Sequence, residues 1–196
     1  MTKRRRTFTA LVVIGMAAAG LAFAVTSSRS DSSSTLFTVG QGVRISAQGI
    51  TDQERTALTV SGATDQLYLL GQHGDHRYYR AVGADGHTCY ALGSDAALLS
   101  LACLHSGPEM PTALIDMSCC GVIAPSGRAV FRLGAVEGIA ADQVSAVGIE
   151  RKDGSLVTTA VAANSYRFAP DAIPSDAVAI VALDSSGAVV KRESVG

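Results

Sequence analysis

Short apolar runs separated by Gly, Asp and Ser follow one another along this chain from residue 36 onward. Runs of this length, with Val, Ile, Leu and Tyr between turn-forming residues, are typical of β-strands. No strand–helix–strand alternation accompanies them, so an α/β nucleotide-binding fold is not expected. The pattern predicts strands over the segments 36–45, 67–70, 77–82, 87–92, 96–103, 113–117, 129–133, 144–151, 155–162, 164–168, 177–183 and 188–192.

Three pairs of these predicted strands are joined by short turns that contain Asp and end on Gly. The turns are Gly83–Gly86, Lys152–Gly154 and Asp184–Gly187. Glycine readily adopts the positive φ that tight hairpin turns require. A succession of antiparallel hairpins predicts a mainly β fold, either an antiparallel β-sandwich or an open barrel.

One short helix is predicted inside this β-rich region. Thr51 and Glu54 have the spacing of a capping box, in which the two residues satisfy each other's free backbone N–H groups at a helix N-terminus. We therefore expect a helix over about 52–58, and no other segment after residue 35 carries a comparable helix signal.

The first 25 residues have a different pattern. The stretch Lys3–Arg6 is basic, and the 18 residues Phe8–Val25 carry no charge. Basic residues ahead of an apolar segment stay in the cytoplasm while the chain that follows is exported. The apolar segment approaches the roughly 20 residues of a membrane-spanning helix, whereas Ala22-Phe23-Ala24 fits the small-residue site of a signal peptidase. The sequence leaves open both an uncleaved anchor and a signal peptide cleaved near Ala24.

These patterns divide the chain into successive parts. We expect a cytoplasmic basic tail at 1–6, a signal or anchor helix at 7–25, a flexible Ser-rich linker at 26–35 and an exported β-rich domain at 36–196. The linker has no apolar periodicity and cannot bury enough surface to offset its ordering entropy. The β-rich part is long enough for one domain or for two lobes at 36–126 and 127–196. The predicted location is the cell membrane with an extracytoplasmic C-terminal domain, or the exterior after cleavage.

Charge and composition narrow the function classes. The residues after Val25 contain 12 Lys and Arg against 17 Asp and Glu, a net charge of −5. Nucleic acids and anionic lipid surfaces call for clustered cations, so no nucleic-acid partner is expected. The chain has no Trp, which argues against an aromatic platform for single-stranded nucleic acid. It contains no Gly-rich phosphate loop and no G-x-S-x-G motif, so we expect no cofactor and no serine-hydrolase site.

Four cysteines lie in the part predicted to be exported, where disulfides are the normal state of paired thiols. A bond between the adjacent Cys119 and Cys120 is disfavoured, because neighbouring Cα atoms are about 3.8 Å apart and disulfides usually need at least about 4.4 Å. Cys89 and Cys103 lie on successive predicted strands. We therefore predict a Cys89–Cys103 disulfide. Cys119 and Cys120 remain as other thiols. They form a soft-metal or redox pair, or one of them pairs elsewhere, or both are small buried residues.

Three histidines offer the one candidate metal site of this sequence. His73 and His76 lie in a predicted turn with Asp75 between them, and His87 begins the strand after the next turn. Two strands of one hairpin would bring His76 and His87 close together, and imidazole nitrogens hold zinc well. Turns are nevertheless rich in His, Asp and Gly for structural reasons, and this H-x-x-H does not lie on a helix as it does in metalloproteases.

The C-terminal third contains a series of turn and strand motifs. They are formed by Gly138, Ile139 and Val144, by Asp153 and Gly154, by Val161, Asn164 and Tyr166, and by Leu183, Asp184, Gly187, Val189 and Val190. This pattern resembles one found in uncharacterised exported β-rich proteins of actinobacteria. The resemblance covers about 130–192 and implies an exported β-rich domain, without an activity to transfer.

Together, these patterns predict an exported or membrane-anchored β-rich protein that serves as a binding or structural module at the cell surface rather than as an enzyme. The expected partners are the membrane, through an uncleaved N-terminal helix, and a cell-wall component or another exported protein. The alternative is a metal-dependent enzyme or metal-binding protein that uses the His73, His76 and His87 region.

Overall fold

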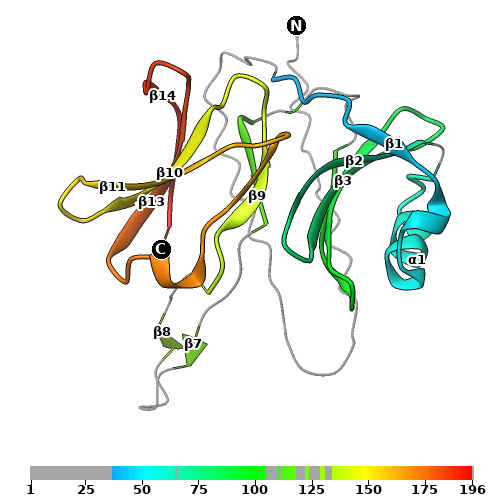
Figure 1. The fold of residues 1–196 in the computed structure, drawn as a ribbon, viewed down its shortest axis with the longest axis horizontal. Coiled ribbons are helices and arrows are strands. Elements are labelled where there is room, and N and C mark those ends of the chain that lie inside the picture. The colour runs from blue at the N-terminus through cyan, green and yellow to red at the C-terminus, as the bar shows by residue number, and fades with distance from the viewer. Residues whose placement is uncertain are drawn as a thin grey trace, which may run out of the picture.

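The computed structural model describes residues 37–64, 66–104, 110, 112–117, 122–123, 129–130 and 134–195. These residues form a mainly β structure in which one α-helix and three larger sheets are stacked in layers (Figure 1). All the strand pairs are antiparallel. The predicted fold class, antiparallel β with one short helix, is confirmed.

The N-terminal half forms a five-stranded meander in which sequence order equals spatial order. Its strands are β1 (Val43–Ile45), β2 (Gln66–His73), β3 (His76–Val82), β4 (Thr88–Gly93) and β5 (Leu98–Leu104). A 3-10 helix, η1 (Ala47–Gly49), and the helix α1 (Asp52–Val60) connect β1 to β2. The helix packs on one face of this sheet, where Leu58 meets Ala81, Cys89 and Ala91 in a shared apolar cluster.

The C-terminal half is a β-sandwich of two sheets. A three-stranded sheet has the order β12-β9-β6, and a four-stranded sheet has the order β11-β10-β13-β14. The chain crosses between the two sheets after β9 and on both sides of β12, as Greek-key sandwiches do. The strands are β6 (Leu114–Asp116), β9 (Glu137–Ala140), β10 (Ala146–Arg151), β11 (Leu156–Ala160), β12 (Ser165–Arg167), β13 (Ala177–Leu183) and β14 (Val189–Ser194), with a 3-10 helix η2 (Pro170–Ala172) before β13. A separate two-stranded hairpin pairs β7 (Val122–Ile123) with β8 (Ala129–Val130).

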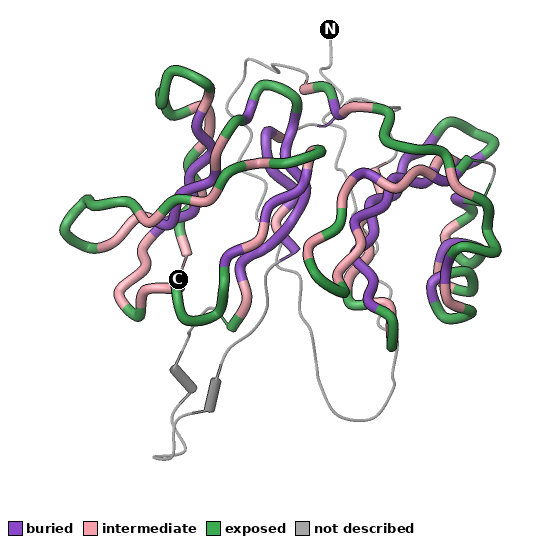
Figure 2. Tube along the Cα trace, in the orientation of Figure 1, coloured by how far each residue is buried: buried purple, intermediate pink, exposed green. Residues whose placement is uncertain are grey.

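The three-stranded sheet is the middle layer and has an apolar cluster on each face. Successive residues of a strand point to opposite faces. In β9, Ile139 belongs to the cluster shared with the five-stranded sheet, whereas Ala140 belongs to the sandwich core. In β6, Ile115 belongs to the cluster shared with the five-stranded sheet, and Leu114 belongs to the sandwich core. All four residues of β9 are buried, which places this strand at the centre of the stack (Figure 2).

The local signals that predicted the elements are visible in the structure. Thr51 caps α1 by accepting a hydrogen bond from the Glu54 N–H at 3.2 Å, while the Thr51 N–H donates to Glu54 Oε2 at 2.6 Å. At the three predicted turns, Gly86, Gly154 and Gly187 have φ values of +83°, +81° and +82°. These turns join β3 to β4, β10 to β11 and β13 to β14.

The observed strands differ from the predicted ones at the N-terminal strand and at β9. The strand predicted over 36–45 is reduced to β1 and an isolated bridge between Phe37 and Met110, because Gly42 adopts a φ of +69° and breaks the extended run. The strand β9 was not predicted. The suggested lobes divide at 126/127, whereas β6 pairs with β9, so Leu114–Asp116 belongs to the sandwich.

The predicted signal or anchor helix at 7–25, the Ser-rich linker at 26–35 and the pair Cys119 and Cys120 lie outside the described residues. Within the described part of the chain, no helix has the length and apolar character needed to cross a membrane.

Candidate functional site

A cluster of polar side chains lies between the five-stranded sheet and the middle sheet, at the end of the β2–β3 hairpin. We call it the seam cluster. Its residues come from two sheets that the chain builds separately. The members are His73, His76 and Tyr78 from the hairpin and Glu137, Ser165 and Arg167 from β9 and β12.

Glu137 is at the centre of the seam cluster. Its side chain is only 5% exposed, and its Oε2 atom lies 2.7 Å from His76 Nδ1 and accepts a hydrogen bond of 2.7 Å from the Tyr78 hydroxyl. Arg167 Nε lies 3.6 Å from the same oxygen. A buried carboxylate is tolerated only when charges and donors of this kind surround it. Burial and the hydrogen bond to Glu137 hold the pKa of Tyr78 well above its ordinary value, so Tyr78 remains a donor.

His76 connects Glu137 to Arg167. Its Nε2 atom lies 3.3 Å from Nη2 of Arg167 and 3.7 Å from Oδ1 of Asp75. Because a guanidinium only donates hydrogen bonds, the contact with Arg167 assigns the acceptor role to Nε2 and the proton to Nδ1, which donates to Glu137. His76 therefore lies between the carboxylate of Glu137 and the guanidinium of Arg167 and contacts both.

His73 and Ser165 form the second contact between the sheets. His73 is the register partner of His76 in the hairpin, and its Nε2 lies 3.1 Å from Ser165 Oγ. The Ser165 hydroxyl donates to the Ala162 carbonyl at 2.9 Å, so it accepts from the His73 ring. A serine nucleophile needs the opposite arrangement, in which the histidine accepts the hydroxyl proton. This pair therefore holds the sheets together and does not activate Ser165.

His87 lies at the opposite end of β3, which corrects the prediction that it approaches His76. The antiparallel register pairs Val82 with Thr88, so the residue after the turn meets the far end of β3, about 20 Å from its start at some 3.3 Å per residue. The ring of His87 contacts Asp85 through Nδ1 and the Ser61 carbonyl through Nε2 at 2.8 Å.

The predicted metal ligands therefore do not converge. His73 and His76 share one site, and His87 takes part in another. In the part of the chain that the structure describes, no group of three or more His, Cys, Asp and Glu side chains is arranged to hold a metal ion.

Four members of the seam cluster were not foreseen from the sequence: Tyr78, Glu137, Ser165 and Arg167. For Glu137 a signal was present, because it is the only charged residue in the apolar stretch 135–141. An acid inside such a run is expected to be either exposed or paired in the interior. The sequence did not indicate which partner it would have, because His76 and Arg167 lie on different sheets.

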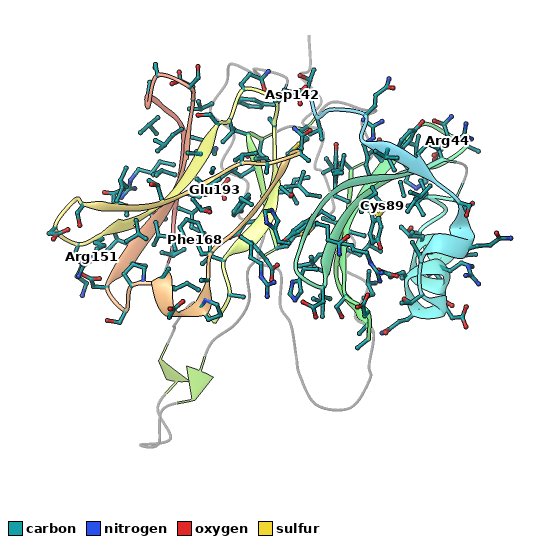
Figure 3. The ribbon with its side chains drawn as sticks, in the orientation of Figure 1. Arg44, Cys89, Asp142, Arg151, Phe168 and Glu193 are labelled. Atoms are coloured by element: carbon teal, nitrogen blue, oxygen red, sulfur yellow. A yellow bond between two sulfur atoms is a disulfide. The ribbon has the colours of Figure 1, made fainter. Side chains whose placement is uncertain are left out.

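The predicted disulfide joins Cys89 and Cys103. These residues are direct register partners on β4 and β5, and they lie on the face of the sheet that α1 covers (Figure 3). The bond therefore ties the last strand of the meander to the strand before it, beneath the helix.

Comparison with known proteins provides no relative from which a function could be transferred. No family model, no curated protein and no solved structure matches this chain. The resemblance of residues 130–192 to exported β-rich proteins of actinobacteria stays a prediction.

Proposed function

We propose that this protein is an exported β-rich module that binds a partner or supports structure at the cell surface. The observation that carries the proposal is the seam cluster. Its carboxylate, imidazole and hydroxyl groups bind one another across two sheets and so connect these sheets inside the molecule. In a hydrolase or a metal-dependent enzyme, by contrast, such groups face a substrate.

The proposed location rests on two independent features. Basic residues precede an apolar segment at the N-terminus, and a disulfide joins two strands in the interior of the five-stranded sheet. Disulfides of this kind persist in oxidising compartments outside the cytoplasm. An anchored or released module of this type would meet a cell-wall component or another exported protein.

The location is tested by fusing an export-dependent reporter to Gly196 and mapping the disulfide by non-reducing peptide analysis. The matched control lacks residues 1–25 and is retained in the cytosol. We expect reporter activity and an intact Cys89–Cys103 bond only for the chain with its N-terminal segment. Absence of reporter activity in the chain with its N-terminal segment, with Cys89 free, would overturn the proposal. N-terminal sequencing of the mature protein then decides between the anchor and cleavage near Ala24.

The role of the seam cluster is tested by zinc calorimetry on the whole protein, with His73→Ala and His87→Ala as variants. We expect no stoichiometric binding at micromolar zinc for any of the three proteins, because His73 and His87 belong to different sites. Tight binding that is lost in both variants would show that the histidines converge and would favour the metal-dependent alternative.

A further inference from the structure

One cross-strand row of the five-stranded sheet carries two arginines and two tyrosines. Direct register partners place Arg44 beside Tyr68, Tyr68 beside Arg80 and Arg80 beside Tyr90. Residues directly opposed in an antiparallel sheet have their side chains on the same face. Tyr90 packs in the cluster shared with the middle sheet, so the whole row faces that sheet. It starts at the edge strand β1 and ends inside the sheet at β4.

Arg80 is a buried cation that the described residues do not neutralise. It is 8% exposed, its Nη1 donates to the Val39 carbonyl at 3.4 Å, and its Nε has no hydrogen-bond partner. Its guanidinium carbon lies 4.8 Å from the ring centroid of Tyr68. None of the ion pairs among the described residues includes Arg80. A cation–π contact offsets only part of the cost of burying a charge.

A second unused donor lies next to Arg80 in the row. Tyr90 is fully buried, and none of the residues that the structure describes forms a hydrogen bond with its hydroxyl. Burial raises the pKa of Tyr90 to about 12, and the charge of Arg80 opposes this rise. The phenol is therefore protonated and close enough to Arg80 to respond to its charge. Buried donors without partners are uncommon in folded proteins, and each one calls for a ligand, a water or a functional reason.

Asp142, the acid whose charge acts on Tyr90, is already engaged. Asp142 Oδ1 accepts hydrogen bonds of 2.8 Å from the Gly40 N–H and from Asn164 Nδ2. In this way it fixes the chain before β1 to the turn before β12. Figure 3 shows Asp142 and Arg44 on the two sides of this end of the molecule. Asp142 influences Tyr90 only through space.

The row is open to solvent at its β1 end. Arg44 is exposed, and no ion pair among the described residues includes it. Arg44 also borders a hollow at this edge of the sheet, on the side where Ile45 and Leu67 face α1. Its lining residues are Arg44, Ile45, Ser46, Ala47, Thr64 and Leu67.

We propose that Arg44, Arg80 and Tyr90 bind an oxyanion, the carboxylate or phosphate group of a small solute that enters at the β1 edge. Arg80 supplies an unused guanidinium donor, Tyr90 an unused hydroxyl, and Arg44 a second positive charge at the entrance. Guanidinium groups suit both carboxylate and phosphate because they donate several hydrogen bonds in one plane. The site is separate from the seam cluster and does not depend on export.

The proposal is tested by isothermal calorimetry on the full-length protein with sodium phosphate and, separately, with sodium acetate, at constant ionic strength set with sodium chloride. We expect binding at one site by at least one of the two anions, and the stronger of them identifies the preferred class. Arg44→Gln should weaken binding about tenfold, since it removes one charged contact. Tyr90→Phe should weaken binding severalfold while the fold stays intact, because it deletes only an unpartnered hydroxyl.

Arg55→Gln is the matched control, because Arg55 is an exposed arginine on α1 whose charge pairs with Asp52 at 2.9 Å. It should bind the anion as the unmodified protein does. Two results would overturn the proposal. One is the absence of binding by both anions at about 10 mM, the weak end of simple anion sites. The other is an equal loss of binding in Arg55→Gln and Arg44→Gln, which would mark a general charge effect.

Discussion

The carboxylate of Glu137 lies in an interior that is otherwise largely apolar, and its Oε2 atom is shared by His76, Tyr78 and Arg167. Each of these partners depends on Glu137 in return. Tyr78 is completely buried, so its hydroxyl would lose its acceptor. Arg167 and His76 would both lose the anion that their side chains contact. Removing one partner of such a buried network costs more than the network contributes as a whole.

The first prediction concerns Glu137→Ala, which should lower the free energy of unfolding by about 1–3 kcal/mol because it leaves the buried Tyr78 hydroxyl without its acceptor. Glu137→Gln should lose less, since the amide oxygen still accepts the Tyr78 hydrogen bond. Urea denaturation of each variant measures the change. Glu150→Ala is the control, because Glu150 pairs with an exposed arginine, Arg192, on the outer sheet. Equal stability of Glu137→Ala and Glu150→Ala would show that the seam cluster contributes nothing.

A second prediction concerns Gly138, the neighbour of Glu137 on the sandwich side of β9. A Cβ at this position would overlap the Ile115 carbonyl oxygen and lie 2.8 Å from the Tyr166 hydroxyl. Gly138→Ala should therefore destabilise the protein by about 1–3 kcal/mol through overpacking. At Gly49 an added Cβ meets nothing within 4 Å, so Gly49→Ala should leave the thermal midpoint nearly unchanged. A matching loss in both variants would contradict this explanation.

The sequence identified His73 and His76 as candidate site residues, but it did not identify the residues that they contact. Their partners Ser165 and Arg167 lie about 90 positions later in the chain, and no local spacing links the two regions. The prediction that His87 lies near His76 failed for the opposite reason. It is close to His76 in sequence, yet the hairpin register carries it to the far end of β3. Chemistry that depends on which sheets stack is not encoded in short motifs.

Among the elements, α1 is the one whose start is determined most locally. Thr51 and Glu54 exchange hydrogen bonds at its first turn, and the side chain of Glu54 is fully buried beneath the helix. The capping residue therefore also positions a buried carboxylate, which lies 3.8 Å from Nη2 of Arg77 on β3. The cap links the helix to the sheet that it covers.

The third prediction is that Thr51→Ala will destabilise the protein by about 1 kcal/mol, with 2 kcal/mol as an upper range, through loss of the N-cap. Urea denaturation followed by circular dichroism would measure it. Gln53→Ala lies in the same helical turn on an exposed position and should change the stability little. A Thr51→Ala variant as stable as Gln53→Ala would show that Glu54 is held by its burial alone.

Turn chemistry explains which elements were predictable. Hairpins that end on Gly86, Gly154 and Gly187 follow directly from the positive φ that those glycines adopt. Among the described residues, no turn glycine of this kind directly precedes or follows the strand β9. It is short, contains Gly138 and Glu137, and is a strand only because β6 and β12 flank it. Its identity comes from tertiary pairing, which overrides its weak local propensity.

Across the molecule as a whole, burial keeps the phenol groups of four tyrosines protonated. Burial holds the pKa values of Tyr78, Tyr79, Tyr90 and Tyr166 above the ordinary value of 10, and for Tyr90 the value is about 12. Above about pH 10 the unfolded chain loses these phenolic protons while the folded chain keeps them. The unfolded state then binds fewer protons than the folded state, so stability falls as the pH rises.

The fourth prediction is therefore a steep loss of stability between about pH 9.5 and 11.5, up to about 1.4 kcal/mol per pH unit for each of these tyrosines. Urea midpoints measured across this range would show it, with tyrosinate absorbance reporting ionisation at the unfolding transition. Tyr90→Phe should reduce the slope by the share of one tyrosine. A stability that stays level through this range would mean that the buried phenols ionise without unfolding.

The middle sheet also limits how this chain can be cut. A fragment that stops after β5 would leave Leu70, Tyr78, Tyr90 and Leu92 exposed to water, because Ile115 of β6 and Ile139 of β9 belong to the cluster that covers them. A fragment beginning at β6 would expose Glu137 without either of its hydrogen-bond donors from the hairpin. Neither half is therefore expected to fold as an independent domain that could be grafted or recombined. A protease that cuts the chain between the halves would leave two fragments that stay associated until a denaturant separates them.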